Sequence, residues 1–539
     1  MKPHLFPLGA LTLHLASASK EAQITLPPSP QSCPDYSGHS STHHQPLSTG
    51  RYKLSYQRPS PACRTFNLTQ VEETILSLKP LIKDPDLFRL FENCFPNTLD
   101  TAITWKGFSR NVTTEEELTF ITTGDIPAMW LRDSAHQLSS YVSLLKPSSS
   151  PHSLASLYRG AINLQARYIL SAPHCNAFNA PLEASSKIPT ATPFGSDGMV
   201  DYVHPPLPGA FDFEDTTGAK SIVHECKYEL DSLASFLQLS WEYFSKTQDL
   251  SFFSGNKTWK KAIETILSTA KELQGGTYNR DGSVAFAPYQ FQRHTSTATE
   301  TLSNSGAGAP VKGATGMVRS AFRPSDDACT YQLFVPGNMM FSSFLAKCTK
   351  IMEGIDKGVA QAMGNMAKGI RDGIERFGRM EHRLFGRMYA YEVDGFGSAN
   401  AMDDANIPSL LSAPLFGYVD RNDTIYQNTR RFVLSESNPY FMWGPVLNST
   451  GGPHVGPGMA WPMGLIVRAL TTDDDEEIFS SVKQILSSTA GYGLIHESVN
   501  THSDSVWTRH WFSWANGLFG QLILDLRDRK PHLLSRSYQ

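Results

Sequence analysis

The stretch TGDIPAMWLRDS, residues 123–134, decides how the rest of the chain is interpreted. It holds two carboxylates (Asp125 and Asp133), the guanidinium of Arg132 and the indole of Trp130. The SAHQLSSYV that follows at once spaces its apolar residues by three and four, which is typical of a helix. The stretch is therefore either a charged, solvated turn or one wall of a site that binds a polyhydroxylated ligand.

The same arrangement occurs six times along the chain. The five other polar, aromatic-rich segments that lead directly into a helical pattern are HECKYEL (224–230), RPSDDACTY (323–331), YEVDGFGSANAMDDANI (391–407), HVGPGMA (454–460) and TRHWF (508–512). If six helices form an inner ring, their N-terminal ends meet at one mouth and present free N–H groups to a polar ligand. The predicted fold is therefore all-α, an (α/α)6 toroid with six inner and six outer helices. The units have no fixed period, so the topology is inferred from their order and not from a repeat.

Composition excludes several classes of partner. A net charge of -4 and a pI near 6.5 give no electrostatic reason to expect nucleic acid or an anionic membrane as a partner. After the N-terminal leader there is no run of eighteen or more apolar residues, so no transmembrane span is predicted. Aromatic residues make up 11 % of the chain, enough for both a large core and rings that stack on a ligand.

The N-terminus indicates export. An apolar run and the small residues Ala16-Ser17-Ala18 predict a signal peptide over residues 1–18. Residues 19–62, rich in Ser, Pro and His, predict a flexible lead-in, and residues 63–535 form the expected catalytic domain. Sequons at Asn67, Asn111, Asn256, Asn422 and Asn448 fit a glycoprotein of the secretory pathway. Seven cysteines without a CxxC pair predict one or two disulfides and a free thiol.

Missing motifs narrow the chemistry. The chain contains no HExxH, GxxxxGK[ST], GxSxG or GxGxxG pattern, the usual markers of zincins, P-loop enzymes, α/β-hydrolases and dinucleotide-binding folds. His224-Glu225 and His496-Glu497 lack the second histidine of a zinc helix. Neither a metal nor a cofactor is therefore expected.

Carboxylates dominate the polar segments and alternate with aromatic rings. The acids are Asp125, Asp133, Glu229, Asp231, Asp326, Asp327, Glu392, Asp394, Asp403, Asp404 and Glu497, and the rings Trp130, Tyr391, Phe396, Trp461, Trp511 and Trp514. Each acid alone is more often a helix cap or an ion-pair partner than a catalyst. Together with apolar ring faces they suit sugars, and two carboxyl groups in different environments are the minimum for glycoside hydrolysis.

One adjacent pair of acids is suited to proton transfer. In Ser325-Asp326-Asp327 the two carboxylates repel each other when both are ionised, so one keeps its proton to higher pH. A carboxylic acid of that kind can act as a general acid, although a helix N-terminus would oppose the shift. Glu497 lies far along the chain and can approach this pair only through the fold.

These motifs together resemble glycoside hydrolase family 125, the exo-acting α-1,6-mannosidases, and in particular a secreted member of fungal type. The similar segments, in order, are TGDIPAMWLRDS, KYELDSL, FRPSDDA, YAYEVDGFG, MDDANIPSLL, NPYF, GLIHES and WFSWANGLF. The resemblance implies an (α/α)6 toroid, no metal, and hydrolysis with inversion at the anomeric carbon. It maps the acid to Asp326 or Asp327, with Asp327 preferred, and the base to Glu497.

The resemblance also implies residues that hold the sugar. Arg132, Asp133, Asp403 and Asn406 are expected to bind the hydroxyls of a terminal mannose, with Asp125 beside them in the first segment. Trp130, His454 and Trp511 are candidates whose alternative role is packing at the mouth, and Asp231 either binds the ligand or caps its helix.

Two alternatives remain open at this stage. The first is a calcium-dependent α-1,2-mannosidase, which also uses a helical toroid, and the second is a non-catalytic mannan-binding protein. The expected partner is a mannose-containing oligosaccharide or N-glycan, with no nucleic acid and no membrane, bound by a monomer.

Overall fold

The computed structural model describes residues 33–110, 116–184, 201–205 and 222–539. The chain separates into two units, residues 1–34 and a body that runs from residue 35 to residue 539. The predicted signal peptide and the sequon at Asn111 lie outside the described residues. Among those that are described, no helix is both long and apolar enough to cross a membrane.

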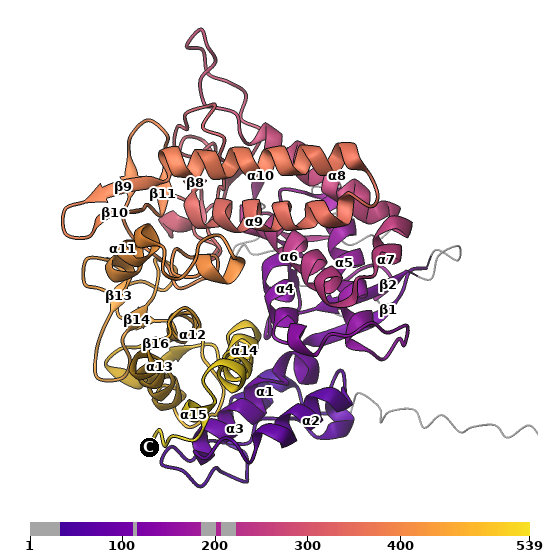
Figure 1. The fold of residues 1–539 in the computed structure, drawn as a ribbon, viewed down its shortest axis with the longest axis vertical. Helices are drawn as coiled ribbons and strands as arrows, with labels where there is room; N and C mark the ends of the chain where they lie inside the picture. Colours follow the sequence, from indigo (N-terminus) through magenta and orange to yellow (C-terminus); the bar gives the residue numbers. More distant parts are fainter. Residues whose placement is uncertain (1–32, 111–115, 185–200, 206–221) are drawn as a thin grey trace, which may run out of the picture. The chain divides into compact units, whose positions relative to one another are not determined.

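The body is rich in helices, as the sequence predicts (Figure 1). The α-helices are α1 (Tyr36–Ser40), α2 (Thr69–Leu78), α3 (Pro85–Cys94), α4 (Leu131–Ser139), α5 (Leu154–Ser171), α6 (Leu230–Thr247), α7 (Leu250–Gly255), α8 (Lys257–Glu272), α9 (Val335–Met352), α10 (Lys357–Phe377), α11 (Thr424–Val433), α12 (Pro462–Leu470), α13 (Asp475–Ser487), α14 (Ser513–Arg529) and α15 (Pro531–Leu534). A short 3-10 turn, η6 (Ala413–Phe416), also takes part in the packing described below.

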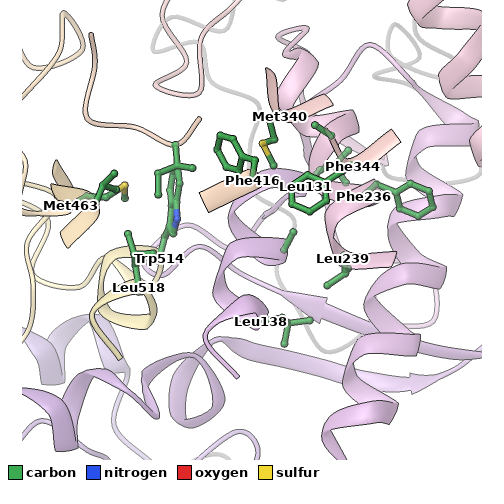
Figure 2. Close-up of a cluster of buried hydrophobic side chains, with 14 of the residues drawn as sticks. Leu131, Leu138, Phe236, Leu239, Met340, Phe344, Phe416, Met463, Trp514 and Leu518 are labelled. Atoms are coloured by element: carbon green, nitrogen blue, oxygen red, sulfur yellow. The ribbon is translucent and has the colours of Figure 1, made fainter. Parts of the chain in front are cut away.

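Six of these elements, which we call the central set, follow the six polar segments. α4 packs against α6, α6 against α9, α9 against η6, α12 against α14, and α14 against α4. Each contributes apolar side chains to one buried cluster (Figure 2), which contains Leu131, Leu138, Phe236, Leu239, Met340, Phe344, Phe416, Met463, Trp514 and Leu518. The polar segments are therefore anchored to a common core.

The helices outside this set are built differently. Every residue of α4 is buried, whereas α10, which lies along α9 (Figure 1), buries only one face. α3, α5, α8, α10, α11 and α13 each begin with a side-chain N-cap, from Asp84, Ser153, Asn256, Asp356, Asp423 and Asp474. None of the α-helices of the central set has a side-chain cap within the described part of the chain. Their first-turn N–H groups are left for other partners.

Short antiparallel strands carry the polar segments. The two-stranded pairings are β1 (Ile103–Phe108) with β2 (Glu117–Ile121), β5 (Tyr202–His204) with β7 (Gln290–Gln292), β9 (Arg379–His382) with β10 (Gly386–Tyr389), and β13 (Phe441–Met442) with β14 (Ser449–Thr450). The three-stranded sheets have the orders β3 (Met129–Trp130), β4 (Ala177–Phe178), β6 (Val223–Glu225); β8 (Leu333–Phe334), β11 (Glu392–Val393), β12 (Ala399–Asn400); and β15 (Met459–Ala460), β16 (Ser498–Asn500), β17 (Ser503–Thr508). Strands β3, β6, β8, β12, β15 and β17 each precede one element of the central set.

A β-bridge joins the first polar segment to the last. Gly124 pairs with Phe512, and Ser513 N donates to Thr123 O at 3.3 Å. Gly124 has a φ of 150°, and a Cβ there would lie 3.1 Å from the Trp511 carbonyl oxygen, so this seam requires glycine. Residues far apart in sequence thereby become neighbours at one edge.

Three details differ from the sequence-based expectation. α4 begins at Leu131, so Arg132 and Asp133 belong to the first turn of the helix and not to the segment before it. The fourth expected helix, PSLLSAPLF, is reduced to η6. From residue 35 onward the expected flexible lead-in packs on the body, where Leu54 is fully buried and Asn93 Nδ2 donates to Ser55 O at 2.9 Å.

Candidate active site

The two aspartates of the RPSDD segment lie on a tight turn between Phe322 and Ala328, which form a bridge. Arg323 N donates to Asp327 O at 2.8 Å, and Asp326 N donates to Arg323 O at 2.9 Å. Asp326 has a φ of 67°, in the left-handed region that is unfavourable for a residue with a Cβ. Its side chain is 25 % exposed, whereas that of Asp327 is 2 % exposed. The turn therefore opens Asp326 to solvent and buries Asp327.

The carboxyl group of Asp326 is surrounded by cations and amides. Its Oδ1 lies 3.8 Å from Arg132 Nη2 and accepts a hydrogen bond from Asn176 Nδ2 at 3.3 Å. Burial alone would raise the pKa of Asp326, but Lys227 and Arg132 outweigh it and lower the pKa to about 2. Asp326 is hydrogen-bonded to Glu229, whose pKa burial raises well above its usual range. The pair thus retains a proton, held on the Glu229 side.

Arg132 is enclosed by carboxylates. Its Nη1 donates to Glu229 Oε2 at 2.5 Å and to Asp231 Oδ2 at 3.2 Å, and its Nη2 lies 3.3 Å from Asp133 Oδ2. The guanidinium also faces the Trp514 ring, 5.4 Å from its centroid. Burial raises the pKa of both Asp133 and Asp231 to about 6, although Arg132 opposes the shift. Asp231 therefore pairs with Arg132 instead of capping α6.

His454 lies among the catalytic candidates. Its Nδ1 is 3.8 Å from Asp327 Oδ2, which also accepts a hydrogen bond from Ser325 Oγ at 2.9 Å. Burial would lower the pKa of His454, but the charges of Asp327, Asp326 and Glu497 raise it to about 9. The charge of one imidazolium therefore interacts with both the RPSDD turn and Glu497, which lie far apart in sequence.

Glu497 is nearly buried at the start of the β16 region, and its N–H donates to Thr508 O at 3.2 Å. Arg509 Nε donates to Glu497 Oε1 at 3.1 Å, and Arg509 Nη1 donates to Asp125 Oδ1 at 2.5 Å. The guanidinium of Arg509 thus links Asp125, in the first polar segment, to Glu497.

The MDDANI segment has a largely architectural role. Both oxygens of Asp403 accept backbone hydrogen bonds, from Leu410 N at 2.9 Å and Leu411 N at 3.0 Å, and burial raises its pKa to about 8. Asn406 Nδ2 donates to Asp404 Oδ1 at 2.9 Å. Burial and the nearby charge of Asp327 raise the pKa of Asp404. The charge of Asp404 therefore interacts with the RPSDD turn.

The tryptophans among the predicted site residues are packed. Trp130 is buried with its ring edge-on to His224, the centroids being 5.4 Å apart. Trp511 is buried and donates from Nε1 to Asn97 Oδ1 at 2.9 Å. The indole N–H of Trp130 has no hydrogen-bond partner among the described residues.

Sequence reasoning missed a second layer of polar residues beside Asp326. Asn176 Nδ2 is shared among Asp326, Glu229 and Glu225, and Asn176 Oδ1 accepts the N–H of Lys227 at 3.0 Å. Lys227 Nζ lies 3.5 Å from Glu225 Oε1. Lys227 stands in the segment HECKYEL, so its place before a helix was a usable signal, but nothing in the sequence distinguished Asn176.

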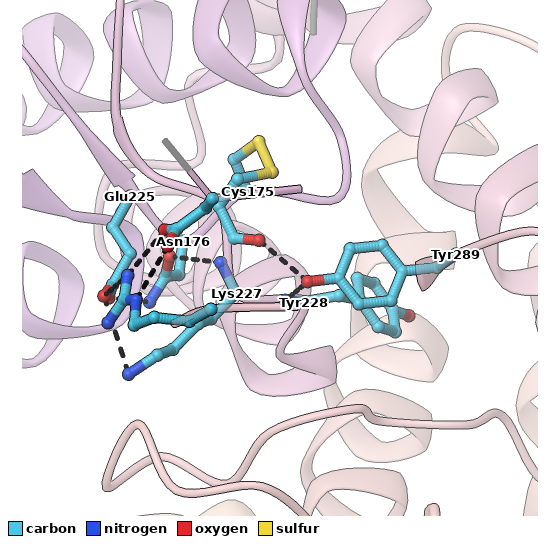
Figure 3. The surroundings of a disulfide bond; sticks show 9 residues. Cys175, Asn176, Glu225, Lys227, Tyr228 and Tyr289 are labelled. Carbon is cyan, nitrogen blue, oxygen red and sulfur yellow. Dashed lines mark hydrogen bonds and ion pairs between the residues drawn. A yellow bond between two sulfur atoms is a disulfide. The ribbon is translucent and has the colours of Figure 1, made fainter. Parts of the chain in front are cut away.

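A disulfide fixes this layer. Cys175 and Cys226 are bonded, and they directly precede Asn176 and Lys227 (Figure 3). Cys94, Cys329 and Cys348 are free and buried, so there are more free thiols than the sequence suggested. The bond ties the end of α5 to the segment that leads into α6.

The arrangement has the parts of an acid–base hydrolase acting on a polar ligand. Two carboxyl sites, the RPSDD turn and Glu497, lie on different elements around one imidazolium, and cations and amides hold further acids in place. Glycoside hydrolysis requires such a pair of carboxyl groups in unlike environments. Fold and site together define a helical glycoside hydrolase.

Comparison with known proteins identifies the family. Residues 84–524 match the family model described as metal-independent alpha-mannosidase (GH125), and this chain belongs to that family. It is 45 % identical over 511 residues to the meiotically up-regulated gene 157 protein of Schizosaccharomyces pombe, covering 94 % of this chain and 95 % of that protein.

A solved structure agrees. A Streptococcus pneumoniae protein, described among metal-independent alpha mannosidases and captured in a non-productive complex with α-1,6-mannobiose, is 32 % identical with a TM-score of 0.72. The match covers 86 % of this chain and 99 % of that one. The predicted family and the prediction of an α-mannosidase are confirmed.

Proposed function

We propose that this protein is an exo-acting α-1,6-mannosidase that removes terminal α-linked mannose from mannose-rich glycans with inversion and without a metal. The observation that chiefly supports the proposal is the surroundings of His454: its Nδ1 lies 3.8 Å from Asp327 Oδ2, and the charges of Asp326 and Glu497 also act on it. The α-1,6-mannobiose bound by the related S. pneumoniae protein supports this linkage. The family's description as metal-independent argues against a calcium-dependent α-1,2-mannosidase.

In the proposed mechanism a carboxylic acid of the RPSDD turn protonates the glycosidic oxygen. Glu497 removes a proton from a water that attacks the anomeric carbon from the opposite face. Inversion requires the two carboxyl groups to stand roughly 6.5–9.5 Å apart, with the water between them.

Either aspartate of the turn can be the acid, and we propose that it is Asp326. Asp326 is the more exposed of the two, and the proton that it donates would be supplied by Glu229, which is hydrogen-bonded to it and holds the proton of the pair. Asp327, which the sequence favoured, is buried against Ser325 and His454. We assign Asp327 to holding the imidazolium.

For the terminal mannose we propose binding by carboxylates that pair with Arg132 in this cluster. Asp133 and Asp231 are partly neutralised by Arg132, and Asp231 Oδ1 has no hydrogen-bond partner among the described residues. Unpaired carboxylate oxygens suit pairs of sugar hydroxyls. Asp403 and Asn406 support the site from behind, since their polar atoms are already engaged.

We also propose that the central set forms the inner ring of an (α/α)6 toroid, with η6 in the place of its fourth helix. The contacts from α4 through α6 and α9 to η6, and from α12 through α14 back to α4, support this topology. The uncapped helix starts then surround the sugar site, where N–H groups stabilise polar ligands.

The decisive experiment is digestion of a panel of α-1,2-, α-1,3- and α-1,6-mannobioses in EDTA, followed by proton NMR of the first product. We expect cleavage of the α-1,6 isomer and release of β-mannose. Activity that EDTA abolishes and calcium restores, or α-mannose as the first product, would contradict the proposal.

Active-site variants test the roles. Glu497→Gln and Asp326→Asn should each lower kcat by at least about 10³-fold while circular dichroism stays native, because each removes a proton-transfer group. Asp327→Asn separates the two aspartates. If it is as inactive as Glu497→Gln while Asp326→Asn keeps most of its turnover, the acid is Asp327.

Export through the secretory pathway is also a proposal. Four of the five sequons lie in the described residues, and Asn67 and Asn422 are exposed there. A gel shift on treatment of the natively expressed protein with an N-glycosidase would support it, and an unshifted band would oppose it.

A further inference from the structure

Arg509, in the last polar segment, contacts Asp125 of the first, 384 residues away in sequence. Its Nε donates to Glu497 Oε1 at 3.1 Å and its Nη1 to Asp125 Oδ1 at 2.5 Å. Glu497 is almost buried, whereas 41 % of the Asp125 side chain is exposed. A buried carboxylate, a cation and an outer carboxylate therefore follow one another from the site to the surface.

We propose that Arg509 is the positioning residue of the Glu497 base and that Asp125 adjusts the strength of its charge. This assignment depends on the proposed role of Glu497. It gives Asp125 a function other than holding the sugar, and it includes Arg509 in the machinery of the reaction.

The backbone indicates that this contact is built into the fold. Arg509 has a φ of 53°, a left-handed conformation that is uncommon for a residue other than glycine. His496 Nδ1 donates to its carbonyl oxygen at 2.9 Å, which fixes the corner between β17 and α14. On the other side, the bridge between Gly124 and Phe512 fixes Asp125 beside this corner. Strained backbone held by its surroundings is frequent at functional sites.

A guanidinium on one oxygen of a base has two consequences. It fixes the rotamer of Glu497, so that the other oxygen keeps one direction toward the attacking water. It also places a positive charge directly against the oxygen that carries the negative charge of a working base. The carboxylate of Asp125 partly neutralises the same guanidinium and so weakens this second effect.

Other charges also act on Glu497 and must remain constant in a test. His454 interacts with Glu497, Asp133 interacts with Arg509, and His496 contacts the backbone of Arg509. Behind them, Asp326 and Asp327 act on His454, and His510 acts on His496. None of them changes in the variants below.

The acid limb of the pH profile of kcat/KM for α-1,6-mannobiose reports protonation of the base in the free enzyme. Arg509→Gln removes the cation, so the limb should move up by about one pH unit, with kcat at the optimum down roughly 10-fold. Asp125→Asn removes the opposing anion, so the limb should move down by about half a pH unit. Opposite shifts from the two ends of one contact are not expected from loss of structure alone.

Arg509→Lys keeps the charge and should leave the limb within about 0.3 pH units of the wild type while still lowering kcat, because a lysine cannot bridge both acids. This variant and Asp125→Asn keep the test valid if Arg509→Gln folds poorly. The matched control is Arg387→Gln, since Arg387 pairs with Glu381 on the exposed β9–β10 hairpin and should not affect the profile.

The outcomes distinguish this inference from the function on which it depends. Suppose that Glu497→Gln is inactive. If the acid limbs of Arg509→Gln and Asp125→Asn then both stay at the wild-type position, or both move in the same direction, Arg509 and Asp125 do not tune the base. If Glu497→Gln remains active, Glu497 is not the base, and the proposed mechanism fails first.

Discussion

At the scale of single residues, His454 is the best reporter of the site. It contacts the buried Asp327, and the charges of Asp326 and Glu497 also act on it. Its folded pKa of about 9 exceeds the unfolded value of 6.5, so the folded state binds the proton more tightly.

The His454 contribution to stability should therefore be fully present below pH 6.5 and lost as the pH rises to about 9. The unfolding free energy of the wild type should therefore decrease over this range. In His454→Asn we expect this decrease to be smaller by about 1–2 kcal/mol, after allowance for the partial exposure of the ring. Urea denaturation at pH 6, 7.5 and 9 measures it. An unchanged pH dependence in the variant would show that His454 carries no such charge.

Asp326, the proposed acid, combines a carboxyl group with an unfavourable backbone conformation. Its φ of 67° suits glycine, so Asp326→Gly should unfold about 1 kcal/mol less readily than Asp326→Ala, although both are inactive. Thermal denaturation of the two variants side by side tests this. Equal stabilities would mean that the turn relaxes and stores no strain.

Residue identity was predictable where chemistry and position coincided. The carboxylates before the helices were found because acids in that position suit sugar chemistry. Arg509, Asn176 and Glu225 were not identified, because their importance comes from contacts with residues distant in sequence. Asp403 was selected over Asp404 because only the fold shows that backbone N–H groups engage both oxygens of Asp403 but only Oδ1 of Asp404, whose Oδ2 has no hydrogen-bond partner among the described residues.

At the scale of elements, the Cys175–Cys226 bond connects two site-bearing segments. Serine at both positions should lower kcat at least about 10-fold and stability by about 2–5 kcal/mol, because Asn176 and Lys227 lose their fixed separation. Activity should be measured at 15 °C, where circular dichroism can confirm that the variant is folded. Full turnover by a folded, destabilised variant would limit the bond to a structural role.

The helical elements were predictable from periodicity because a buried stripe leaves its spacing in the sequence, as in α5 and α8. Two features were not. PSLLSAPLF contains two prolines and forms only η6, and the strands before the central set have two to six residues, too short for a detectable alternation. Both depend on tertiary contacts.

At the scale of the whole molecule, the seam between Gly124 and Phe512 joins the first polar segment to the last. Gly124→Ala places a Cβ about 3.1 Å from the Trp511 carbonyl oxygen at a φ of 150°. We expect a loss of about 1–3 kcal/mol of stability and a lower kcat, since Asp125 moves with the seam. Chemical denaturation and mannobiose kinetics measure the two effects.

The control is Gly369→Ala on α10, where an added Cβ meets nothing within 4 Å. That change should stabilise the protein by about 0.5–1 kcal/mol without altering turnover. If Gly124→Ala behaves like Gly369→Ala, the seam tolerates a side chain and does not transmit to the site.

The same seam has a consequence for biosynthesis. During translation Asp125 is synthesised long before Arg509. Until α14 is also synthesised, the apolar surfaces of α4 and α12 that α14 covers have no partner. We therefore expect the chain to lack a complete core and a complete site until α14 has been synthesised, so a stop codon upstream of α14 should yield an inactive, aggregation-prone product.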